Sequence, residues 1–433
     1  MQLTHTKKIS TVLAAATCSL LNAPVQAQDE NNWEFDTAIL YYGETDRVSL
    51  VEGVISATKD FGDQHIFNTK LVIDTLTGAS ASGAVAQPTA QTFTRPSGNG
   101  QYIIEPNSLP LDDTFRDTRV QLSANWTQPI MKDTRTTIGA NVSREYDYLS
   151  VGTSASIERD FNNKNTTGLF GLSYQYDSID PVGGRPVGLS TMVVDNGQFG
   201  SGEAGEASFK QAFNLTRIDE TEDKSIVDVL LGVTQVINRR MLVQMNYSYS
   251  NNSGYLNDPY KVLSVINTEG ETQSIVHENR PDSRAKHGIY AQTKYAFDSG
   301  VADLSYRFAS DDWDIQSHTV DTRFRYKLND RDYLQPHFRY YQQSAADFYR
   351  PYLNQSDSMP LYASADYRLG EMTAITVGLK YGHKMNNGHE WAVRAEYYQQ
   401  STKSAGFENP GILSSQDLYP SVDAFIVQFS YNF

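Results

Sequence analysis

The sequence predicts an all-β protein, a transmembrane antiparallel up-and-down β-barrel of about sixteen strands with long extracellular loops and short periplasmic turns. Three observations lead to this fold class. Hydrophobic and polar residues alternate along many short segments, which is the two-residue period of a strand with one apolar face. Long polar connections and tight turns alternate between these segments. The chain also begins with the features of an export signal.

The export signal covers residues 1–27. Two early lysines give it a positive start, residues 9–21 are mostly apolar, and Val25-Gln26-Ala27 fits a small-x-small cleavage site. We therefore expect a cleaved signal peptide, which leaves 28–433 as a single barrel domain in the outer membrane of a Gram-negative cell. An uncleaved membrane anchor is the weaker interpretation, because the apolar stretch is shorter than the ~20 residues that a spanning helix needs.

The composition argues against several classes of function. The one cysteine, Cys18, lies inside the predicted signal, so we expect no disulfide, thiolate metal site or cysteine nucleophile in the mature chain. The formal net charge of −15 argues against nucleic acid as a partner. No segment shows a convincing helical spacing of apolar residues, and no apolar run after the signal is long enough for a membrane helix.

The predicted strands begin at 33–42 and are clearest in a hairpin that starts at 119–127. A turn at 129–133 returns the chain through 136–142, and both arms alternate apolar with polar residues. The same alternation recurs along the chain, with apolar faces formed by Phe170, Leu172, Tyr174 and Tyr176, by Val227, Val229, Leu231 and Val233, and by Met241, Val243, Met245, Tyr247 and Tyr249.

Two kinds of connection join these strands. The tight turns lie at 61–64, 162–165, 238–239, 298–300, 329–331 and 385–388, whereas the long connections lie at 77–115, 179–223 and 254–285. A single-chain barrel normally has an even number of strands and both termini on the periplasmic side. We therefore place 347–371 in an external loop, although 361–369 resembles a strand. The segment 77–100, rich in Gly, Ala, Ser, Thr and Pro, can pack inside the barrel or form a flexible external loop.

A soluble β-sandwich or solenoid is the alternative architecture. A sandwich of this size would usually contain some strands buried on both faces, which read as continuous apolar runs. Almost every segment here stays two-faced. This pattern, the export signal and the aromatic terminal strand together favour the barrel.

Four stretches of the chain are typical of one family. They are Asp46-Arg47-Val48, "TLTGASASGA" at 75–84, "EYDYLS" at 145–150, and "DYRLG" at 366–370 leading into "TVGLKYG" at 376–382. With these stretches the sequence resembles the bacterial outer-membrane proteins catalogued as domain of unknown function 3570, over most of the mature chain. The resemblance implies a barrel. It implies no particular activity, because the stretches contain no catalytic motif.

The chain ends in "AFIVQFSYNF", in which aromatic and aliphatic residues take every second position. Phe429, Tyr431 and Phe433 resemble the terminal signal that the outer-membrane assembly machinery recognises by pairing with an exposed strand edge. A simpler role for these aromatic residues, in the interfacial girdle, is compatible with this one. We expect the last strand to close the barrel against the strand near Trp33.

Charged residues occupy the polar face of several predicted strands. On 319–328 the apolar positions are Val320, Phe324, Tyr326 and Leu328, so the residues between them must point into the lumen. Charges of both signs there would create a transverse field that selects solutes. The alternative is that they are only solvated or paired, because the interior of a wide barrel is wet. The pore-lining candidates are Lys294, Asp303, Arg307, Asp321, Arg323, Arg325, Lys327, His337, Arg339, Arg394 and Glu396.

These features favour a porin-like channel or transporter for small polar solutes. One alternative is a non-conducting scaffold that binds partner proteins for export or envelope redox work, and another is a membrane-embedded hydrolase. No G-x-S-x-G motif occurs, and only His318 and His337 among the histidines lie in clearly predicted strands, so we expect no enzyme activity.

The sequence predicts neither a cofactor nor a metal site. The acidic clusters at 112–117 and 311–314 do not follow the spacing of an EF-hand calcium loop. The expected partners are outer-membrane lipid and lipopolysaccharide, the outer-membrane assembly machinery, and a periplasmic or surface protein.

Overall fold

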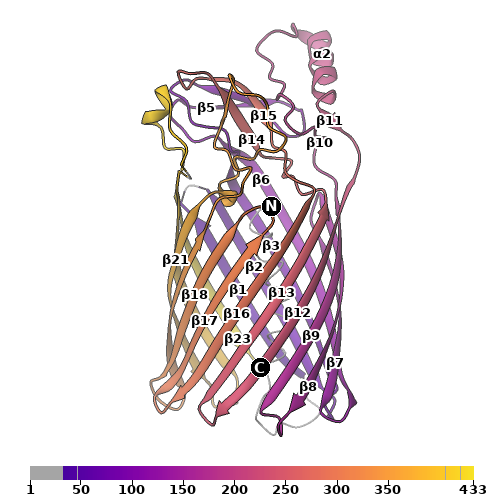
Figure 1. The fold of residues 1–433 in the computed structure, drawn as a ribbon, viewed down its shortest axis with the longest axis vertical. Helices are drawn as coiled ribbons and strands as arrows, with labels where there is room; N and C mark the ends of the chain where they lie inside the picture. Colours follow the sequence, from indigo (N-terminus) through magenta and orange to yellow (C-terminus); the bar gives the residue numbers. More distant parts are fainter. Residues whose placement is uncertain (1–32, 46, 405, 420) are drawn as a thin grey trace.

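A computed structural model describes residues 33–45, 47–404, 406–419 and 421–433, and in these residues sixteen antiparallel strands close into one barrel (Figure 1). The predicted fold class is therefore confirmed, whereas the predicted signal peptide lies outside the described residues. The barrel strands are β1 (Trp33–Glu44), β2 (Val48–Asp60), β3 (Ile66–Ala81), β6 (Leu111–Met131), β7 (Thr134–Arg144), β8 (Tyr148–Phe161), β9 (Thr166–Ile179), β12 (Glu222–Asn238), β13 (Met241–Gly254), β16 (Ser283–Phe297), β17 (Gly300–Asp311), β18 (Gln316–Lys327), β19 (Asp332–Gln343), β21 (Met372–Lys384), β22 (Glu390–Thr402) and β23 (Val422–Asn432).

The first and last strands close the sheet. β1 and β23 pair antiparallel, with Thr37 opposite Tyr431 and Ile39 opposite Phe429. Beyond the ladder, Phe35 N–H donates to the carbonyl of Phe433 at 2.7 Å, and Phe433 N–H donates to the carbonyl of Phe35 at 2.9 Å. The two rings stack with centroids 5.2 Å apart. The terminal residue thus completes the seam against the strand near Trp33, as the sequence predicted.

The outward face of the barrel is apolar, with aromatic residues near both ends. Ile39 and Val377, on opposite sides of the seam, are 63% and 54% exposed, as expected for side chains that face lipid. Near the turn end, the rings of Phe61 and Trp126 lie 5.6 Å apart. Near the loop end, Tyr397 and Phe425 lie 5.2 Å apart. The strands therefore carry the two interfacial girdles of an outer-membrane barrel.

The six predicted tight turns and the long loops lie at opposite ends, as predicted, and all the long loops lie at the upper end in Figure 1. Three short turns, between β1 and β2, between β7 and β8, and between β17 and β18, lie at the same end as the long loops. Several strands are longer than the sequence indicated. β3 and β6 continue their pairing to Ala81 and Leu111, which shortens the predicted connection 77–115 to 82–110. Gly78 lies at the irregularity in this ladder with φ +134°, and a Cβ there would lie 2.2 Å from the carbonyl oxygen of Arg47. Only glycine fits at that position.

The long loops pack into a structure at the external mouth, here called the cap: loops 82–110, 180–221, 255–282, 344–371 and 403–421, of which residues 405 and 420 are not described. Periodicity alone did not predict its elements, because each is short. They are β4 (Gln91–Thr94), β5 (Gln101–Ile104), β10 (Arg185–Pro186), α2 (Gly202–Asn214), β11 (Arg217–Ile218), β14 (Val262–Ile266), β15 (Thr272–His277), β20 (Leu353–Asn354), η1 (Tyr367–Leu369) and η2 (Gly411–Ser415).

The sequence predicted no helix, and this prediction was wrong. α2 is a 13-residue α-helix that projects from the cap (Figure 1). Its Phe209 and Phe213 are buried, but they are spaced by four residues in a segment of otherwise small or polar residues. The apolar stripe is therefore too narrow to stand out in the sequence. No helix in the described ranges is both long and apolar enough to cross a membrane.

The cap has a hydrophobic core of its own. All five residues of β14 are buried, and β14 pairs with β15 on one side and β20 on the other. Leu263 packs with Val276 and Leu353, which come from loops 255–282 and 344–371. Ile266 packs with Val85 and Leu413 from two further loops. Thus segments far apart in the sequence share one core, and the loop 82–110 packs in the cap.

Deletion of Phe433 should impair barrel assembly while leaving export intact. The deletion removes two backbone hydrogen bonds and one ring stack at the seam, a loss of about 2–4 kcal/mol. We expect the heat-modifiable, folded form to decrease sharply in outer-membrane fractions, while the amount of exported protein stays the same. Phe433→Tyr, which keeps the ring and the terminal backbone, is the matched control. Normal levels of folded barrel after the deletion would contradict the role of this residue.

Candidate functional site

The inward face of the barrel is polar, because strand alternation turns every second side chain away from lipid. On β18, Tyr326 faces outward and is 43% exposed, whereas Asp321 makes its contacts with inward residues of β19. The structure places all the predicted pore-lining residues at inward positions of β16, β17, β18, β19 and β22. Whether solutes pass among them stays a prediction.

Most of these residues come together along one row of paired positions that crosses the wall. The row runs from Lys294 on β16 through Asp303, Arg323, His337 and Gly378 to Glu396 on β22. Within the row, Lys294 Nζ lies 3.7 Å from a carboxylate oxygen of Asp303. In the adjacent rows Asp321 is opposite Arg339, and Lys380 is opposite Arg394.

The other predicted residues lie above or below this group. Arg307 is paired with Thr319, nearer the mouth. Arg325 lies toward the turn end, where its guanidinium group stacks 3.6 Å from the ring centroid of Tyr333 and lies 3.4 Å from Glu390. Lys327 is the last residue of β18, opposite Tyr333. These three residues do not join the central group.

His337 is the centre of the group. Its Nδ1 lies 2.8 Å from a carboxylate oxygen of Glu396, and its Nε2 lies 3.0 Å from a carboxylate oxygen of Asp321. A carboxylate only accepts hydrogen bonds, so both ring nitrogens must donate and the ring carries a positive charge. Arg339 Nε also donates to Asp321 at 2.7 Å, and Arg394 Nη1 lies 3.6 Å from Glu396. Arg323 Nε lies 3.5 Å from the other carboxylate oxygen of Asp321, so Asp321 is shared by three cations and Glu396 by two.

A cavity of about 190 Å³ opens beside His337 in the same wall. It is a recess because Ala392 and Ser430, which are opposite each other on β22 and β23, are small. Long cationic side chains surround them. The lining residues are Arg323, Gln335, His337, Lys380, Ala392, Arg394, Glu396, Gln428 and Ser430.

Five of these lining residues were missed as site residues by sequence reasoning, among them Lys380. The signal for Lys380 was present, since it lies between Leu379 and Tyr381 in an alternating stretch and therefore had to face inward. Gln335, Ala392, Gln428 and Ser430 carry no charge, so the sequence offered no reason to select them. Their grouping became visible only with the register between β19, β21, β22 and β23.

Charge is divided unevenly around the interior. On β16 to β22, bases outnumber acids at inward positions, and on β1 to β12 acids outnumber bases. This arrangement produces the transverse field that the sequence suggested as one possibility. On the basic side the bases include Arg284, Lys286, Lys294, Arg307, Arg323, Arg325, Lys327, Arg339, Lys380 and Arg394, against Asp303, Asp311, Asp321, Glu390 and Glu396. On the acidic side the acids include Asp36, Glu44, Glu52, Asp74, Glu158, Asp160, Asp177 and Asp228, against Lys70, Arg119, Arg135 and Lys224.

Paired side chains account for much of the acidic side. Arg119 Nε donates to Asp74 at 2.7 Å, and Lys224 Nζ lies 3.0 Å from Asp177. Arg135 contacts both Glu158 and Asp160. Among the described residues, no group of three or more His, Cys, Asp and Glu side chains has an arrangement suited to a metal ion.

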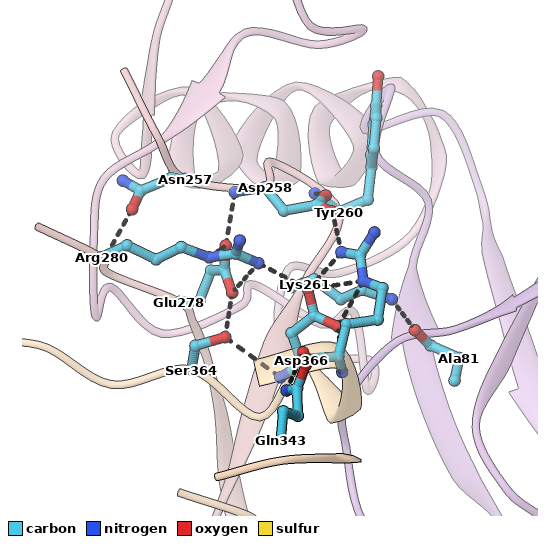
Figure 2. A network of polar contacts seen from close by, with 11 residues as sticks. Ala81, Asn257, Asp258, Tyr260, Lys261, Glu278, Arg280, Gln343, Ser364 and Asp366 are labelled. Atoms are coloured by element: carbon cyan, nitrogen blue, oxygen red, sulfur yellow. Dashed lines mark hydrogen bonds and ion pairs between the residues drawn. The ribbon is translucent and has the colours of Figure 1, made fainter. Parts of the chain in front are cut away.

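Above the lumen, a buried ionic network holds the cap loops together (Figure 2). Three acids and three bases form it: Asp258, Glu278, Asp366, Lys261, Arg280 and Arg368. Arg280 Nη2 lies 2.9 Å from Asp366, and Arg368 Nη2 lies 3.2 Å from Asp258. These two pairs join loop 255–282 to loop 344–371, and the formal charges of the six side chains cancel.

Two further contacts tie this network to the barrel. Lys261 is 2% exposed, and its Nζ donates to the backbone carbonyl of Ala81 at the end of β3. The Gln343 side chain on β19 donates to the carbonyls of Arg368 and Gly370 at 2.9 and 2.8 Å. The cap is therefore attached to two separate parts of the wall.

The network shifts the ionisation of its own members. Burial raises the pKa of Asp366, but the guanidinium groups of Arg368 and Arg280 outweigh burial and hold that pKa well below its ordinary range. Burial lowers the pKa of Lys261, an effect that Asp366 and Asp258 partly offset. Each charge thus depends on its neighbours, so removal of one member should leave a buried charge without compensation.

The cap also contacts the external rim of the barrel at two short turns that are not part of the cap loops. The Tyr260 hydroxyl donates to the carboxylate of Asp147 in the turn between β7 and β8. On the other side, the guanidinium group of Arg47, in the turn between β1 and β2, lies 6.0 Å from the ring centroid of Tyr367. Because these turns lie apart on the rim, the cap extends across the external mouth, and a solute from outside would have to pass it.

His277, the last residue of β15, is a buried histidine within the cap. It is 3% exposed, and its Nε2 lies 3.4 Å from Arg217 Nη2, so the ring nitrogen accepts a hydrogen bond. Burial, together with the positive charge of Arg217, lowers the pKa of His277 to about 3. The folded cap therefore contains neutral His277 at all but strongly acidic pH.

The sequence placed only His318 and His337 in clearly predicted strands, and this set of strand histidines is incomplete. His318 lies on the outward face, where its Nδ1 is 2.7 Å from the hydroxyl of Tyr306, which agrees with an interfacial position. His287 on β16 was missed, and it makes an equivalent pair with Tyr247 at 2.8 Å. Both pairs lie near the loop end of the barrel.

Asp366→Ala should loosen the cap and leave the barrel intact. Removing one partner of a buried ion pair costs about 3–5 kcal/mol, because the remaining guanidinium groups lose their counter-charge. We expect rapid proteolysis within loops 255–282 and 344–371, while the heat-modifiable barrel persists. Asp357→Ala, at an exposed position in the same loop, is the control. Equal protection of the cap in both variants would rule out a structural role for the network.

The cap should lose stability as pH falls from 6.5 toward 3. In an unfolded cap His277 takes up a proton near pH 6.5, whereas the folded cap accepts it only near pH 3, so acid favours unfolding. At pH 4.5 the loss is about 2–3 kcal/mol. This loss of stability can be measured from the hydrogen exchange of β14 and β15 amides, after correction for the pH dependence of the intrinsic exchange rates. His277→Gln should reduce the pH dependence, whereas the control His65→Gln at the turn end should not. An unchanged pH dependence in His277→Gln would contradict this assignment.

The fold is similar to those of several solved outer-membrane proteins. A "Bacterial polysaccharide outer membrane secretin" is 8% identical with a TM-score of 0.43, covering 94% of this chain and 100% of that one. A mutant ferric enterobactin receptor (PfeA) from Pseudomonas aeruginosa, in complex with enterobactin, is 10% identical with a TM-score of 0.42, covering 93% of this chain and 60% of the receptor chain. A loop-deletion mutant of OmpT, an outer membrane protein of Vibrio cholerae, is 8% identical with a TM-score of 0.40, covering 93% and 98%.

At these TM-scores the similarities carry no argument about function. No curated protein matches the chain. A family model does match, over residues 10–433, and its description is "Protein of unknown function (DUF3570)". This match spans nearly the whole sequence and agrees with the resemblance found in its short stretches. With its closed barrel, two-faced strands and packed cap, the chain belongs to the DUF3570 family of outer-membrane β-barrels.

Proposed function

We propose that this protein is a channel for small polar solutes across the outer membrane. The observation that carries the proposal is the division of charge around the lumen, with a basic wall at β16 to β22 facing an acidic wall at β1 to β12. A barrel of sixteen strands is wide enough for an aqueous lumen. Opposed charges across it would orient dipolar solutes and disfavour apolar ones.

In this proposal the cap sets the size limit. The cap extends over the mouth and is held by its own core and by the buried ionic network, so solutes would enter through gaps between loops rather than through a wide opening. Its network is charge-balanced, so the cap itself would impose little charge preference. The choice among charged solutes would then fall to the lumen below.

We propose no catalytic role. His337, the histidine within the charged group, has both ring nitrogens occupied by carboxylates and cannot accept a proton from a serine hydroxyl in that state. The proposed interactions are with membrane lipid and lipopolysaccharide along the outward face, and with the outer-membrane assembly machinery through Phe429, Tyr431 and Phe433.

One observation favours a second candidate, a scaffold that binds a partner protein. The cap is a packed structure, and α2 projects from it and is followed by Leu215, which is 80% exposed. A non-conducting scaffold would use such a surface to hold a partner. It predicts stable co-purification of one protein with the wild-type barrel and loss of that protein when residues 202–214 are deleted. Repeated isolation of the barrel alone would count against it.

Purified protein should give stepwise conductance in planar lipid bilayers. Replacing residues 345–370 with a short Gly/Ser linker should increase the single-channel conductance, because this loop supplies Asp366 and Arg368 to the cap network. Deleting 202–214 is the control, since α2 contacts the cap at turn 97–100 but supplies no residue to the cap network, so its loss should leave conductance unchanged. Failure of both the wild type and the loop-replaced variant to conduct would refute the channel.

A further inference from the structure

We propose that the recess beside His337 binds a small divalent oxyanion, such as phosphate or a short dicarboxylate, and that this site selects the solute of the channel. The inference rests on the proposed function, because it assigns the solute class to the same lumen. Arg323, Lys380 and Arg394 line one cavity of about 190 Å³. That combination of cations and available space occurs on the basic wall, below the cap.

The recess has more positive charge than its own carboxylate neutralises. Glu396 is the one acid that lines it, and this carboxylate is already in contact with His337 and Arg394. No ion pair joins Lys380 to a carboxylate within the described residues, and its Nζ lies 5.9 Å from the ring centroid of Tyr333. If these bases only balanced lumenal acids, Lys380 would be expected to contact a carboxylate directly, and it contacts none among the described residues.

Donor groups are also available in the recess. Arg394 Nε is buried and has no hydrogen-bond partner, although Nη2 of the same side chain donates to Gln428. A guanidinium group binds carboxylate and phosphate oxygens through two parallel hydrogen bonds, and Arg394 lines the recess, so its guanidinium group can offer donors to an oxyanion there. Gln335 and Ser430 add neutral polar groups at the edge of the same cavity.

The size of the recess limits the ligand. One water molecule in the liquid occupies about 30 Å³, so the cavity has room for about six waters, or for one small anion with part of its hydration shell. Phosphate and a four-carbon dicarboxylate fit this limit, whereas a nucleotide or an oligosaccharide does not. A ligand with two negative charges matches the surplus positive charge of the recess better than a ligand with one, because two bases, Lys380 and Arg394, lie opposite each other on adjacent strands.

Two measurements on the purified full-length barrel test the inference. Isothermal titration calorimetry with inorganic phosphate and, separately, with succinate measures binding, and chloride stands as the monovalent control. In bilayers, the same anions should reduce the chloride current in a saturable way. Binding of only one of the two probes would identify which oxyanion the site takes and would support the shared chemistry.

The variants separate the recess from the rest of the lumen. Lys380→Gln combined with Arg394→Gln should weaken phosphate or succinate binding at least about 10-fold and should abolish saturable block. Lys294→Gln, which removes a lumenal base paired with Asp303 outside the recess, should leave binding unchanged. Lys380→Arg combined with Arg394→Lys keeps both charges and should retain binding, which shows that loss in the first variant is not misfolding.

The outcomes distinguish this inference from the proposed channel. A barrel that conducts but binds neither phosphate nor succinate would overturn the site and leave the channel intact. Equal binding by the wild type and by the Lys380→Gln, Arg394→Gln variant would also overturn it. A barrel that binds phosphate at the recess but never conducts would support the site and refute the channel.

Discussion

The backbone pairing of β1 with β23 is the constraint on which the rest of the structure depends. Inside a bilayer an unpaired strand edge has no water to satisfy its N–H and C=O groups, so the sheet must close on itself. Phe35 and Phe433 complete that closure at the turn end. Once the sheet is closed, each strand has one lipid side and one interior side, and alternation decides which side chains reach the lumen.

This constraint explains how much could be predicted from the sequence. The outward Phe429 and the inward Arg323 both follow from a period of two, and Lys380 could have been added by the same rule. The charged row from Lys294 to Glu396 also needed the register between strands, which local alternation does not specify.

The cap could not be predicted in this way, because its order comes from contacts between distant segments. Lys261 appears in the sequence as an ordinary loop lysine, and nothing near it indicates that its ammonium group is buried against the carbonyl of Ala81. β14 has only five residues, and its burial depends on strands and loops from elsewhere in the chain. Short segments of this kind gain their structure from tertiary packing rather than from propensity.

The cap and the lumen use charge in opposite ways. In the cap, Asp258, Glu278 and Asp366 balance Lys261, Arg280 and Arg368 in a buried network, and such a network fixes geometry while presenting little net field. In the lumen, the basic wall keeps a surplus around the recess at Lys380 and Arg394. A balanced set of charges suits a structural role, whereas an unbalanced set in contact with water attracts a charged ligand.

The central claim is that strand alternation separates lipid from a water-filled, charged lumen beneath the cap. A cysteine scan along β18 tests it most directly, since the sequence contains no cysteine other than Cys18. Single cysteines at inward positions such as Arg323 should react with a membrane-impermeant thiol reagent, whereas outward positions such as Phe324 should react only with a lipid-soluble one. Labelling with a period of two is the predicted result. Inward cysteines that do not react with the water-soluble reagent would contradict an aqueous lumen.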